Sequence, residues 1–389
     1  MRQAAQTGRC HALNVEQQKA LTDLGNCRTP RLGGRIEECS ACGQCQFVYN
    51  SCRNRHCPKC QAGCRAAWLA READWLLPVE YHHLVFTLPD ELHVLVGDNA
   101  RLVYGLLFDA ASAAVRELAA DPKHLGAQVG LTAVLHTWGQ TLRLHPHLHL
   151  MATGGGLSCN RHGEIDESPC WRSCRPGFFL PVRPLSRLFH GKFLAGLREA
   201  LAGNKVTLPQ TLQDGLARQA WLAKLQQQDW VVYSKPPTAG PEVVLKYLAR
   251  YTYRVAMSNQ RLVHADADTV TFQWKDYRAA GQQKKMTLPV ETFARRFLQH
   301  VLPHRFVRVR HYGLLGNHGR AVKRSLCRQL LAAATTAQTL RTTVQPAAVD
   351  EPHLCRACGQ GVMIVVELLP RQFGVTCDDT EAAGEMDSS

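Results

Sequence analysis

The chain has 389 residues, of which 45% are hydrophobic and 20% are charged, and it carries a formal net charge of +14 with a pI near 9.2. This length predicts two or three domains, and the composition allows a packed core. No apolar run reaches the roughly 20 residues that a membrane helix needs, and the N-terminus lacks the apolar stretch of a signal peptide. We therefore expect a cytoplasmic protein without a membrane partner.

Local patterns along the chain predict an α+β protein with a central antiparallel sheet. Helical patterns span residues 15–26, 65–78, 91–120, 185–201 and 242–253. Strand patterns span residues 81–88, 130–136, 145–153 and 229–234, and a hairpin is expected at 261–290. Gly154, Gly155 and Gly156 predict a turn after the third strand, and the Ala/Thr-rich residues 332–349 predict a linker. Strands followed by long helices, without strict βαβ alternation, favour the α+β class.

Sixteen cysteines in a chain without an export signal favour metal binding over disulfides, and nine of them lie before residue 65. Two C-x-x-C knuckles predict a zinc-ribbon-like N-terminal module with one closed Zn²⁺ site, whose ligands are Cys39, Cys42, Cys57 and Cys60. An Fe–S cluster or redox thiols are the alternative. A second Zn²⁺ site could use Cys27, Cys52 and His56, although free buried thiols are the simpler interpretation. The lone Cys355-x-x-Cys358 knuckle is too weak a signal to predict a metal.

Closely spaced histidines suggest a second kind of metal site. His147 and His149 are separated by one residue on a predicted strand, so both side chains project to the same face and can bind one ion. His136 on the preceding strand is the preferred third ligand, and His145 and Gln140 are the alternatives. Imidazoles with open water positions suit a Lewis acid for phosphoryl chemistry. Such a His-x-His pair is otherwise most often a surface or core pair.

Two tyrosines on a predicted helix are candidate nucleophiles. Tyr247 and Tyr251 are four residues apart and share one helix face, whereas Tyr253 should face elsewhere. A neutral tyrosine attacks a phosphate poorly unless the phosphate is polarised, which a histidine-bound metal would do. Arg250 and Arg254 flank the pair and could neutralise phosphate charge. Core packing is the alternative for an aromatic pair at this spacing.

The positive charge is concentrated late in the chain. Between Lys275 and Arg328 there are 13 Lys or Arg residues against two acids, whereas the tail after Arg328 has eight acids against three basic residues. A block of this density predicts a nucleic-acid partner, with a solvated basic face as the alternative. The side chains expected to contact the DNA backbone are Lys275, Arg295, Arg296, Arg305, Arg308 and Arg310.

Several motifs together resemble the transposases of the insertion sequence 91 family, which are two-tyrosine HUH (His-hydrophobic-His) rolling-circle transposases. The resemblance covers about residues 25–330 and rests on these segments in chain order: Tyr49-Asn-Ser-Cys-Arg-Asn-Arg-His-Cys-Pro-Lys-Cys60-Gln61, His136-Thr-Trp-Gly-Gln140, His145-Pro-His-Leu-His149, Tyr247-Leu-Ala-Arg-Tyr251 and His311-Tyr-Gly-Leu-Leu-Gly316. One departure is Arg35, where many relatives carry His, and it disfavours a second Zn²⁺ on Cys27, Cys52 and His56.

The resemblance implies a fold, a chemistry and a partner. It implies a zinc-binding domain followed by a Rep-like HUH nuclease domain, with Mg²⁺ or Mn²⁺ on His147 and His149. It also implies that Tyr247 and Tyr251 each form a 5′-phosphotyrosine link to single-stranded DNA at the transposon ends and target, in a bacterial, nucleoid-associated protein. A plasmid replication initiator or relaxase, and a non-enzymatic zinc protein that binds nucleic acid, are the alternatives.

Together these patterns predict four regions. Residues 1–75 form a zinc-binding domain, and residues 76–260 form the HUH nuclease domain with the tyrosine helix. Residues 261–328 form a basic DNA-binding region, and residues 329–389 form a flexible acidic tail with the lone C-x-x-C.

Overall fold

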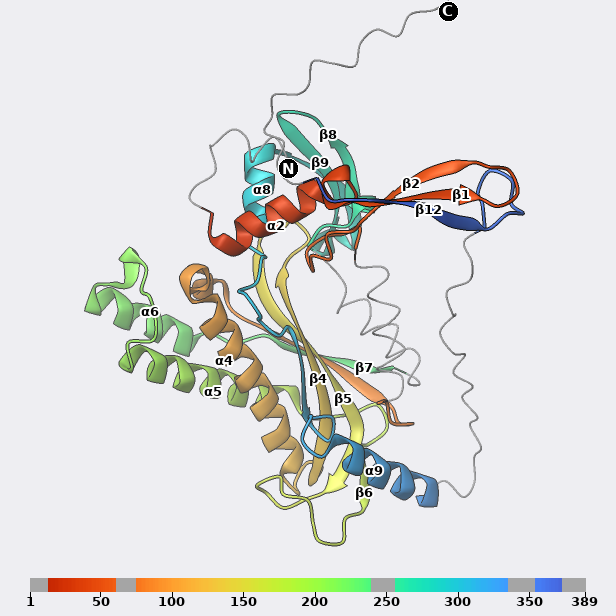
Figure 1. The fold of residues 1–389 in the computed structure, drawn as a ribbon. Helices are drawn as coiled ribbons and strands as arrows, with labels where there is room; N and C mark the ends of the chain where they lie inside the picture. The colour runs from red at the N-terminus through yellow and green to blue at the C-terminus, as the bar shows by residue number, and fades with distance from the viewer. Residues whose placement is uncertain (1–12, 61–74, 239–255, 335–353, 373–389) are drawn as a thin grey trace, which may run out of the picture.

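An antiparallel sheet of six strands forms the centre of the computed structural model, which describes residues 13–60, 75–238, 256–334 and 354–372. The strand order is β11-β4-β5-β3-β7, and the short β6 pairs with the far end of β5 (Figure 1). The strands are β3 (Tyr81–Thr87), β4 (Ala127–Trp138), β5 (Leu144–Ser158), β6 (Trp171–Ser173), β7 (Val232–Thr238) and β11 (Val309–Gly313). The prediction of an α+β protein with a central antiparallel sheet is confirmed.

Two long helices cover one face of this sheet. They are α4 (His93–Ala120) and α5 (Val182–Ala202), and α6 (Gly215–Gln227) lies beside α5 (Figure 1). Alternate side chains of the central strands, such as Phe86 and Leu148, are buried against these helices in the main hydrophobic core. Because strand side chains alternate, the intervening residues, which include the predicted metal ligands, project to the opposite face.

The three consecutive glycines do not form the predicted turn. Gly154, Gly155 and Gly156 lie within β5, where the strand passes very close to neighbouring backbone. A Cβ atom added to Gly154 would lie 2.8 Å from the carbonyl oxygen of Glu80, and one added to Gly155 would lie 2.6 Å from that of Arg172. The glycines are therefore needed for close packing of the strands.

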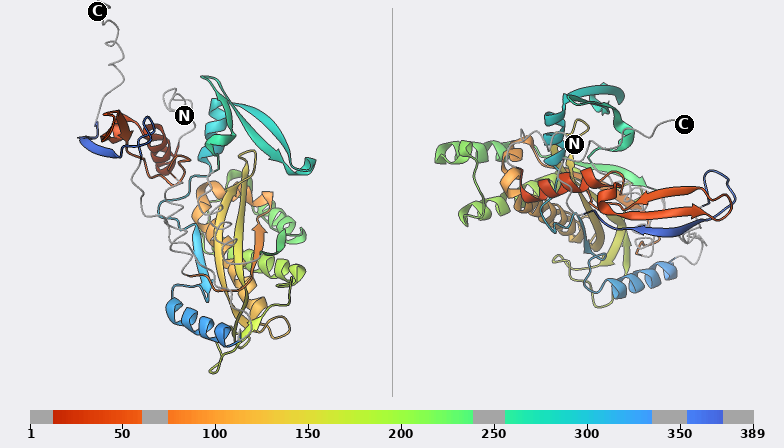
Figure 2. Two further views of the ribbon diagram at one scale, coloured as in Figure 1. Left: turned by 90° about the vertical axis from the view of Figure 1, so that its right-hand side faces the viewer. Right: turned by 45° about the horizontal axis from the view of Figure 1, so that its top comes forward.

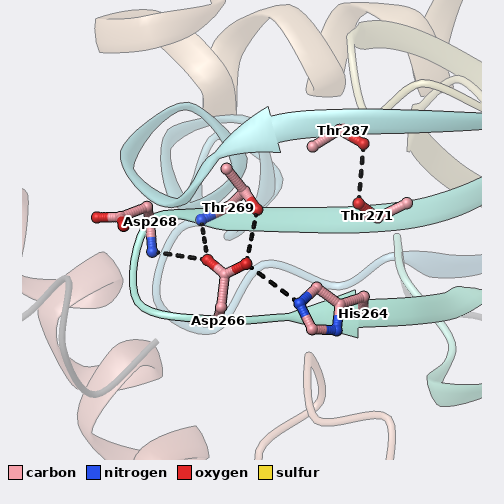
Figure 3. Close-up of polar contacts among 6 residues, drawn as sticks. All are labelled: His264, Asp266, Asp268, Thr269, Thr271 and Thr287. Carbon is pink, nitrogen blue, oxygen red and sulfur yellow. Dashed lines mark hydrogen bonds and ion pairs between the residues drawn. The ribbon is translucent and has the colours of Figure 1, made fainter.

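A second antiparallel sheet, with α8 (Val290–Leu298) packed against it, follows in place of the predicted single hairpin. Its strands are β8 (Leu262–Ala265), β9 (Thr269–Asp276) and β10 (Gln282–Pro289). Figure 3 shows that the Asp266 carboxylate closes the β8–β9 turn by accepting hydrogen bonds from the backbone amides of Thr269 (2.6 Å) and Asp268 (2.8 Å). These bonds lower the pKa of Asp266 to about 2.

A third sheet, also of three strands, joins an early segment of the chain to a late one. Its order is β12-β1-β2, with β1 (Gly34–Cys39), β2 (Cys45–Tyr49) and β12 (Met363–Leu369). Figures 1 and 2 show this sheet and the β8–β9–β10 sheet at the same end of the central sheet. The segment around β12 is therefore part of this sheet, whereas the sequence predicted that it belongs to a flexible tail. Its pairing partner lies more than 300 residues earlier, so no local pattern could reveal it.

The remaining elements connect these sheets. Helix α2 (Val15–Asn26) starts at a capping box formed by Asn14 and Gln17, and α9 (Arg320–Ala334) packs on Leu77, Leu157 and Leu314. Short 3₁₀ turns occur at Pro30–Leu32, Asp90–Leu92, Gln210–Leu212, Asn259–Arg261 and Tyr277–Ala279.

The predicted helices at 15–26, 91–120 and 185–201 and the predicted central strands are confirmed within a few residues. The helix predicted at 242–253, and residues 65–74 of the one predicted at 65–78, lie outside the described residues. None of the described helices has the length and apolarity needed to cross a membrane.

Candidate active site and metal centres

Three histidines meet on the sheet face opposite α4 and α5. His136 on β4 pairs directly with His147 on β5, and His149 follows two residues later on the same face. One ring nitrogen of each histidine lies within 4.8 Å of the corresponding nitrogens of the other two. His136 and His149 are only 3% and 8% exposed, and His147 is half-buried. The side chains can therefore converge on a single ion with one accessible side.

Hydrogen bonds fix which nitrogen of two histidines faces the cluster. His147 donates its Nδ1 proton to the carbonyl oxygen of His145 at 2.7 Å, which places the lone pair of this ring on Nε2. Nδ1 of His149 lies 3.0 Å from Nε2 of His83 on β3, so these two rings share a hydrogen bond. Metal-binding histidines commonly use one nitrogen for the ion while the other is held by such a partner.

The electrostatic environment keeps the rings of His149 and His83 neutral. Burial, followed by the neighbouring His136, His147, His83 and Lys235, lowers the pKa of His149 well below its usual range. Burial also lowers the pKa of His83 to about 3, with Lys235 and His147 adding to the shift. A neutral imidazole is the form that binds a metal, so His149 can coordinate an ion at neutral pH without first losing a proton.

Of the three proposed third ligands, the structure groups only His136 with the His147–His149 pair. The His145 ring lies 5.0 Å from the His147 ring, centroid to centroid, but its nitrogens are not part of the group. Gln140 is engaged elsewhere, since its Oε1 accepts a hydrogen bond from the backbone amide of Lys275 at 3.4 Å.

Sequence reasoning missed Lys235, which lies on the histidine face. Lys235 on β7 pairs with His83 on β3 in the sheet register, and its charge contributes to the lowered pKa values of His83 and His149. Alternation along β7 could have placed Lys235 on one face with Tyr233. Only the order of the strands shows that this face is the one that carries the histidines.

The candidate nucleophiles Tyr247 and Tyr251, and the flanking Arg250 and Arg254, lie outside the described residues.

The cysteines form two groups of four, and neither is the predicted set. Cys57 and Cys60 meet Cys27 and Cys52, whereas the Cys39–Cys42 knuckle meets the late Cys355–Cys358 knuckle. In each group the four Sγ atoms lie within 4.8 Å of one another. The predicted pairing of two neighbouring knuckles was wrong because β1 and β2 carry Cys39 and Cys42 toward β12.

The first group consists of Cys27, Cys52, Cys57 and Cys60. The Sγ atom of Cys27 lies 3.4 Å from that of Cys60 and 3.6 Å from that of Cys57. The Sγ atom of Cys52 lies 3.6 Å from that of Cys60. These separations are close to the edge of a Zn–thiolate tetrahedron, about 3.8 Å for Zn–S bonds near 2.3 Å. They exceed the ~2.05 Å of a disulfide.

His56 is not a member of this group, although Cys27 and Cys52 are. Burial lowers the pKa of His56 to about 3, and the positive charges of Arg55 and Arg308 add to the shift. Arg55 itself donates to the carbonyl oxygens of Phe306 (2.7 Å) and Pro303 (3.0 Å). The arginine beside the knuckle thus fixes the zinc module to the segment before β11.

The predicted DNA-binding residues differ in their surroundings. Lys275, Arg295 and Arg305 are exposed, and Arg308 is half-buried. Arg296 donates to the carbonyl oxygen of Thr141 at 3.2 Å, and burial lowers its pKa. The Arg310 guanidinium lies 4.2 Å from the centre of the Phe108 ring. Arg296 and Arg310 therefore have packing roles, which the count of basic residues could not show.

Comparisons with known proteins identify the family of this chain. Residues 130–323 match the family model described as "Putative transposase", and residues 1–88 match the one described as "Transposase zinc-binding domain". The chain is 45% identical over 380 residues to "Putative transposase y4qJ" of Sinorhizobium fredii, covering 95% of this chain and 94% of that protein. It is 28% identical over 359 residues to "Transposase for insertion sequence element IS801" of Pseudomonas savastanoi pv. phaseolicola, covering 88% and 81%. Both family models match in order, and a relative that is 45% identical is covered to 94% of its length. The chain therefore belongs to the insertion sequence 91 family of transposases.

Proposed function

We propose that this transposase cuts and rejoins single-stranded DNA at the ends of its element by a rolling-circle mechanism. The nucleophiles would be Tyr247 and Tyr251, and the histidine group would hold one Mg²⁺ or Mn²⁺ ion. The observation that carries the proposal is the convergence of His136, His147 and His149 on one sheet face.

The histidine group fits a divalent ion by its chemistry. Its members are largely buried, His149 has a strongly lowered pKa, and Nδ1 of His147 is committed to the carbonyl oxygen of His145. An ion bound there would supply Lewis acidity that polarises a DNA phosphate. His147 is the more exposed member of the group, whereas His136 and His149 are buried, so a phosphate would approach a bound ion from the side of His147.

The chain's own residues would carry the covalent step. One tyrosine hydroxyl loses its proton to solvent as its oxygen forms a bond to the phosphorus. The bond from phosphorus to the 3′ oxygen breaks, and the 3′ oxygen takes up one proton from solvent and leaves as a hydroxyl group. The DNA then carries its 5′ phosphate on the tyrosine, and attack by a 3′ hydroxyl reverses the same bond changes. Lys235, on the histidine face, is suited to contact a phosphate oxygen.

The cysteine group of Cys27, Cys52, Cys57 and Cys60 would hold a structural Zn²⁺ in the N-terminal domain. Four thiolates close the coordination sphere, so this site contributes to folding and not to cleavage. The proposed domains follow the sequence prediction for residues 1–75, 76–260 and 261–328, with residues 354–372 joined to the first.

The test uses single-stranded oligonucleotides from both strands at each end of the element, labelled at either terminus, with Mn²⁺ and a denaturing gel. We expect a covalent adduct on the 5′ phosphate of the fragment downstream of the cut and a free 3′ hydroxyl on the upstream fragment. The double variant Tyr247→Phe/Tyr251→Phe should form no adduct yet still bind the DNA, and Tyr253→Phe is the matched control that should retain cleavage. An adduct that persists in the double variant, or that maps to Tyr253, would overturn the assignment of the nucleophiles.

A further inference from the structure

The second cysteine group joins two knuckles from opposite ends of the chain. The Sγ atom of Cys39 lies 3.7 Å from that of Cys358, and the Sγ atom of Cys42 lies 3.8 Å from that of Cys355. Four thiolates bound to one Zn²⁺ at about 2.3 Å would be separated by about 3.8 Å, whereas a disulfide needs about 2.05 Å. The spacing matches four ligands of one ion.

The two knuckles are also built alike. The sequence Cys-x-Ala-Cys-Gly-Gln occurs at residues 39–44 and again at residues 355–360. Gly43 and Gly359 have φ angles of 68° and 69°, and their amides donate to the carbonyl oxygens of Cys39 (3.0 Å) and Cys355 (2.8 Å). A positive φ is readily adopted by glycine, so both knuckles end in the same tight turn.

Backbone amides point at the sulfur atoms in both knuckles. The amide of Ala41 donates to Sγ of Cys39, and the amide of Gly361 donates to Sγ of Cys358, each at 3.4 Å. Such bonds stabilise a thiolate over a thiol, which is the form that binds a metal. Gly361 also lies against the first knuckle, since a Cβ atom added there would be 2.3 Å from Sγ of Cys39.

Strand pairing alone buries little of the C-terminal segment. β12 pairs with β1 along its length, but Ile364, Val365 and Val366 remain 53%, 49% and 53% exposed, and Leu368 remains 75% exposed. A strand with so little buried apolar surface has a small hydrophobic contribution to hold it, and the contact closes a separation of 313 residues between Cys42 and Cys355. A cross-link is therefore needed to hold this segment in place.

We propose that Cys39, Cys42, Cys355 and Cys358 bind a second structural Zn²⁺ ion, which fastens residues 354–372 to the N-terminal zinc module. The site is closed by four thiolates and is separate from the histidine group and from the first cysteine group. The zinc module of this chain is thus completed by its C-terminal segment, beyond the region matched by the zinc-binding family model.

The first test counts metal ions in the full-length protein by elemental analysis and native mass spectrometry. We expect two Zn²⁺ per chain, and one in Cys355→Ser/Cys358→Ser. The matched control, Cys45→Ser/Cys170→Ser, changes two exposed cysteines outside both groups and should keep two. One Zn²⁺ in the unaltered protein, or two in Cys355→Ser/Cys358→Ser, would overturn the proposal.

A second variant keeps every thiol. Gly361→Ala places a methyl group against Sγ of Cys39 and should make one of the two ions leave faster when a chelator is added. Equal release of both ions at the rate of the unaltered protein would contradict the proposed geometry.

The third test asks whether the ion holds the segment. A protease site introduced between residues 340 and 345 allows the chain to be cut after folding. The C-terminal fragment should elute with the rest of the protein until a chelator is added, and should separate without chelator in Cys355→Ser/Cys358→Ser. If the fragment separates while two Zn²⁺ ions remain bound, then Cys355 and Cys358 do not bind the same ion as Cys39 and Cys42. All three measurements are independent of DNA cleavage, so they can fail while the proposed nuclease function stands.

Discussion

Nε2 of His83 and Nδ1 of His149 lie 3.0 Å apart, in a hydrogen bond between two buried rings on adjacent strands. His83 pairs with Met151 in the register, so its side chain lies one step along the same face from His149. If His149 uses Nε2 for a metal, His83 accepts its Nδ1 proton and holds the ring in position. This makes His83 a positioning residue.

Replacing His83 should therefore weaken metal binding without removing a ligand. We expect His83→Phe to lower Mn²⁺ affinity by about 10–100-fold, the usual effect of removing the hydrogen-bond partner of a metal-binding histidine. His83→Gln retains an oxygen that can accept the proton of His149 and should recover much of that affinity. Titration calorimetry with Mn²⁺ measures both, and equal affinities for the two variants would remove the positioning role.

His136 and His145 offer a comparison between a ligand and its neighbour. His136→Ala should weaken Mn²⁺ binding by more than His83→Phe and should abolish metal-dependent cleavage, because a ligand itself is removed. His145→Ala keeps the carbonyl oxygen that orients His147 and should have a smaller effect. Affinity for single-stranded DNA without metal is the control, and we expect it to stay the same in both. The reverse order of effects would make His145 the third ligand.

The salt dependence of DNA binding should separate the exposed basic residues from the packed ones. Affinity for DNA falls as salt rises. Neutralising Lys275, Arg295 and Arg305 should make this fall shallower, by about 0.7 in the slope of log affinity against log salt for each DNA phosphate that the protein no longer neutralises. Arg310→Gln should instead lower the melting temperature, because it removes the cation that packs on the Phe108 ring. Fluorescence anisotropy with single-stranded DNA over a range of KCl concentrations gives the slopes. A slope unchanged by the triple substitution would remove these residues from the interface.

Buried His300 should make stability depend on pH. Burial lowers its pKa to about 4, and its Nε2 donates to the carbonyl oxygen of Leu142 at 3.2 Å while Nδ1 accepts from Thr137 at 3.1 Å. Because the unfolded chain takes up the proton near pH 6.5 and the folded chain near pH 4, the stabilisation is complete above pH 6.5 and is lost as pH falls from about 6.5 to about 4.

The decrease in unfolding free energy over this range is on the order of 3 kcal/mol. His300→Gln cannot titrate, so its unfolding free energy should fall less steeply over the same range. Urea unfolding of both proteins at several pH values tests this, and the difference between them cancels effects of the other titrating groups. Parallel curves would show that His300 does not contribute.

Much of the histidine site could be predicted from local spacing. The alternation of strand side chains places His147 and His149 on one face whatever the fold, and the apolar runs at 81–88 and 130–136 are strands in the structure. The register that sets His136 opposite His147, and the position of β7 that brings Lys235 to the same face, depend on strand order. No periodicity within one strand carries that information.

The cysteines also show the difference between what local spacing predicts and what the tertiary structure decides. The sequence by itself determined that this chain has C-x-x-C knuckles able to present pairs of thiolates, an antiparallel α+β core and a dense basic segment. Only the tertiary structure decided which knuckles meet, because a C-x-x-C turn constrains its own two cysteines and says nothing about the direction from which the other two arrive. Here β12 returns across more than 300 residues to pair with β1, and that pairing takes Cys39 and Cys42 to Cys355 and Cys358 while Cys57 and Cys60 meet Cys27 and Cys52.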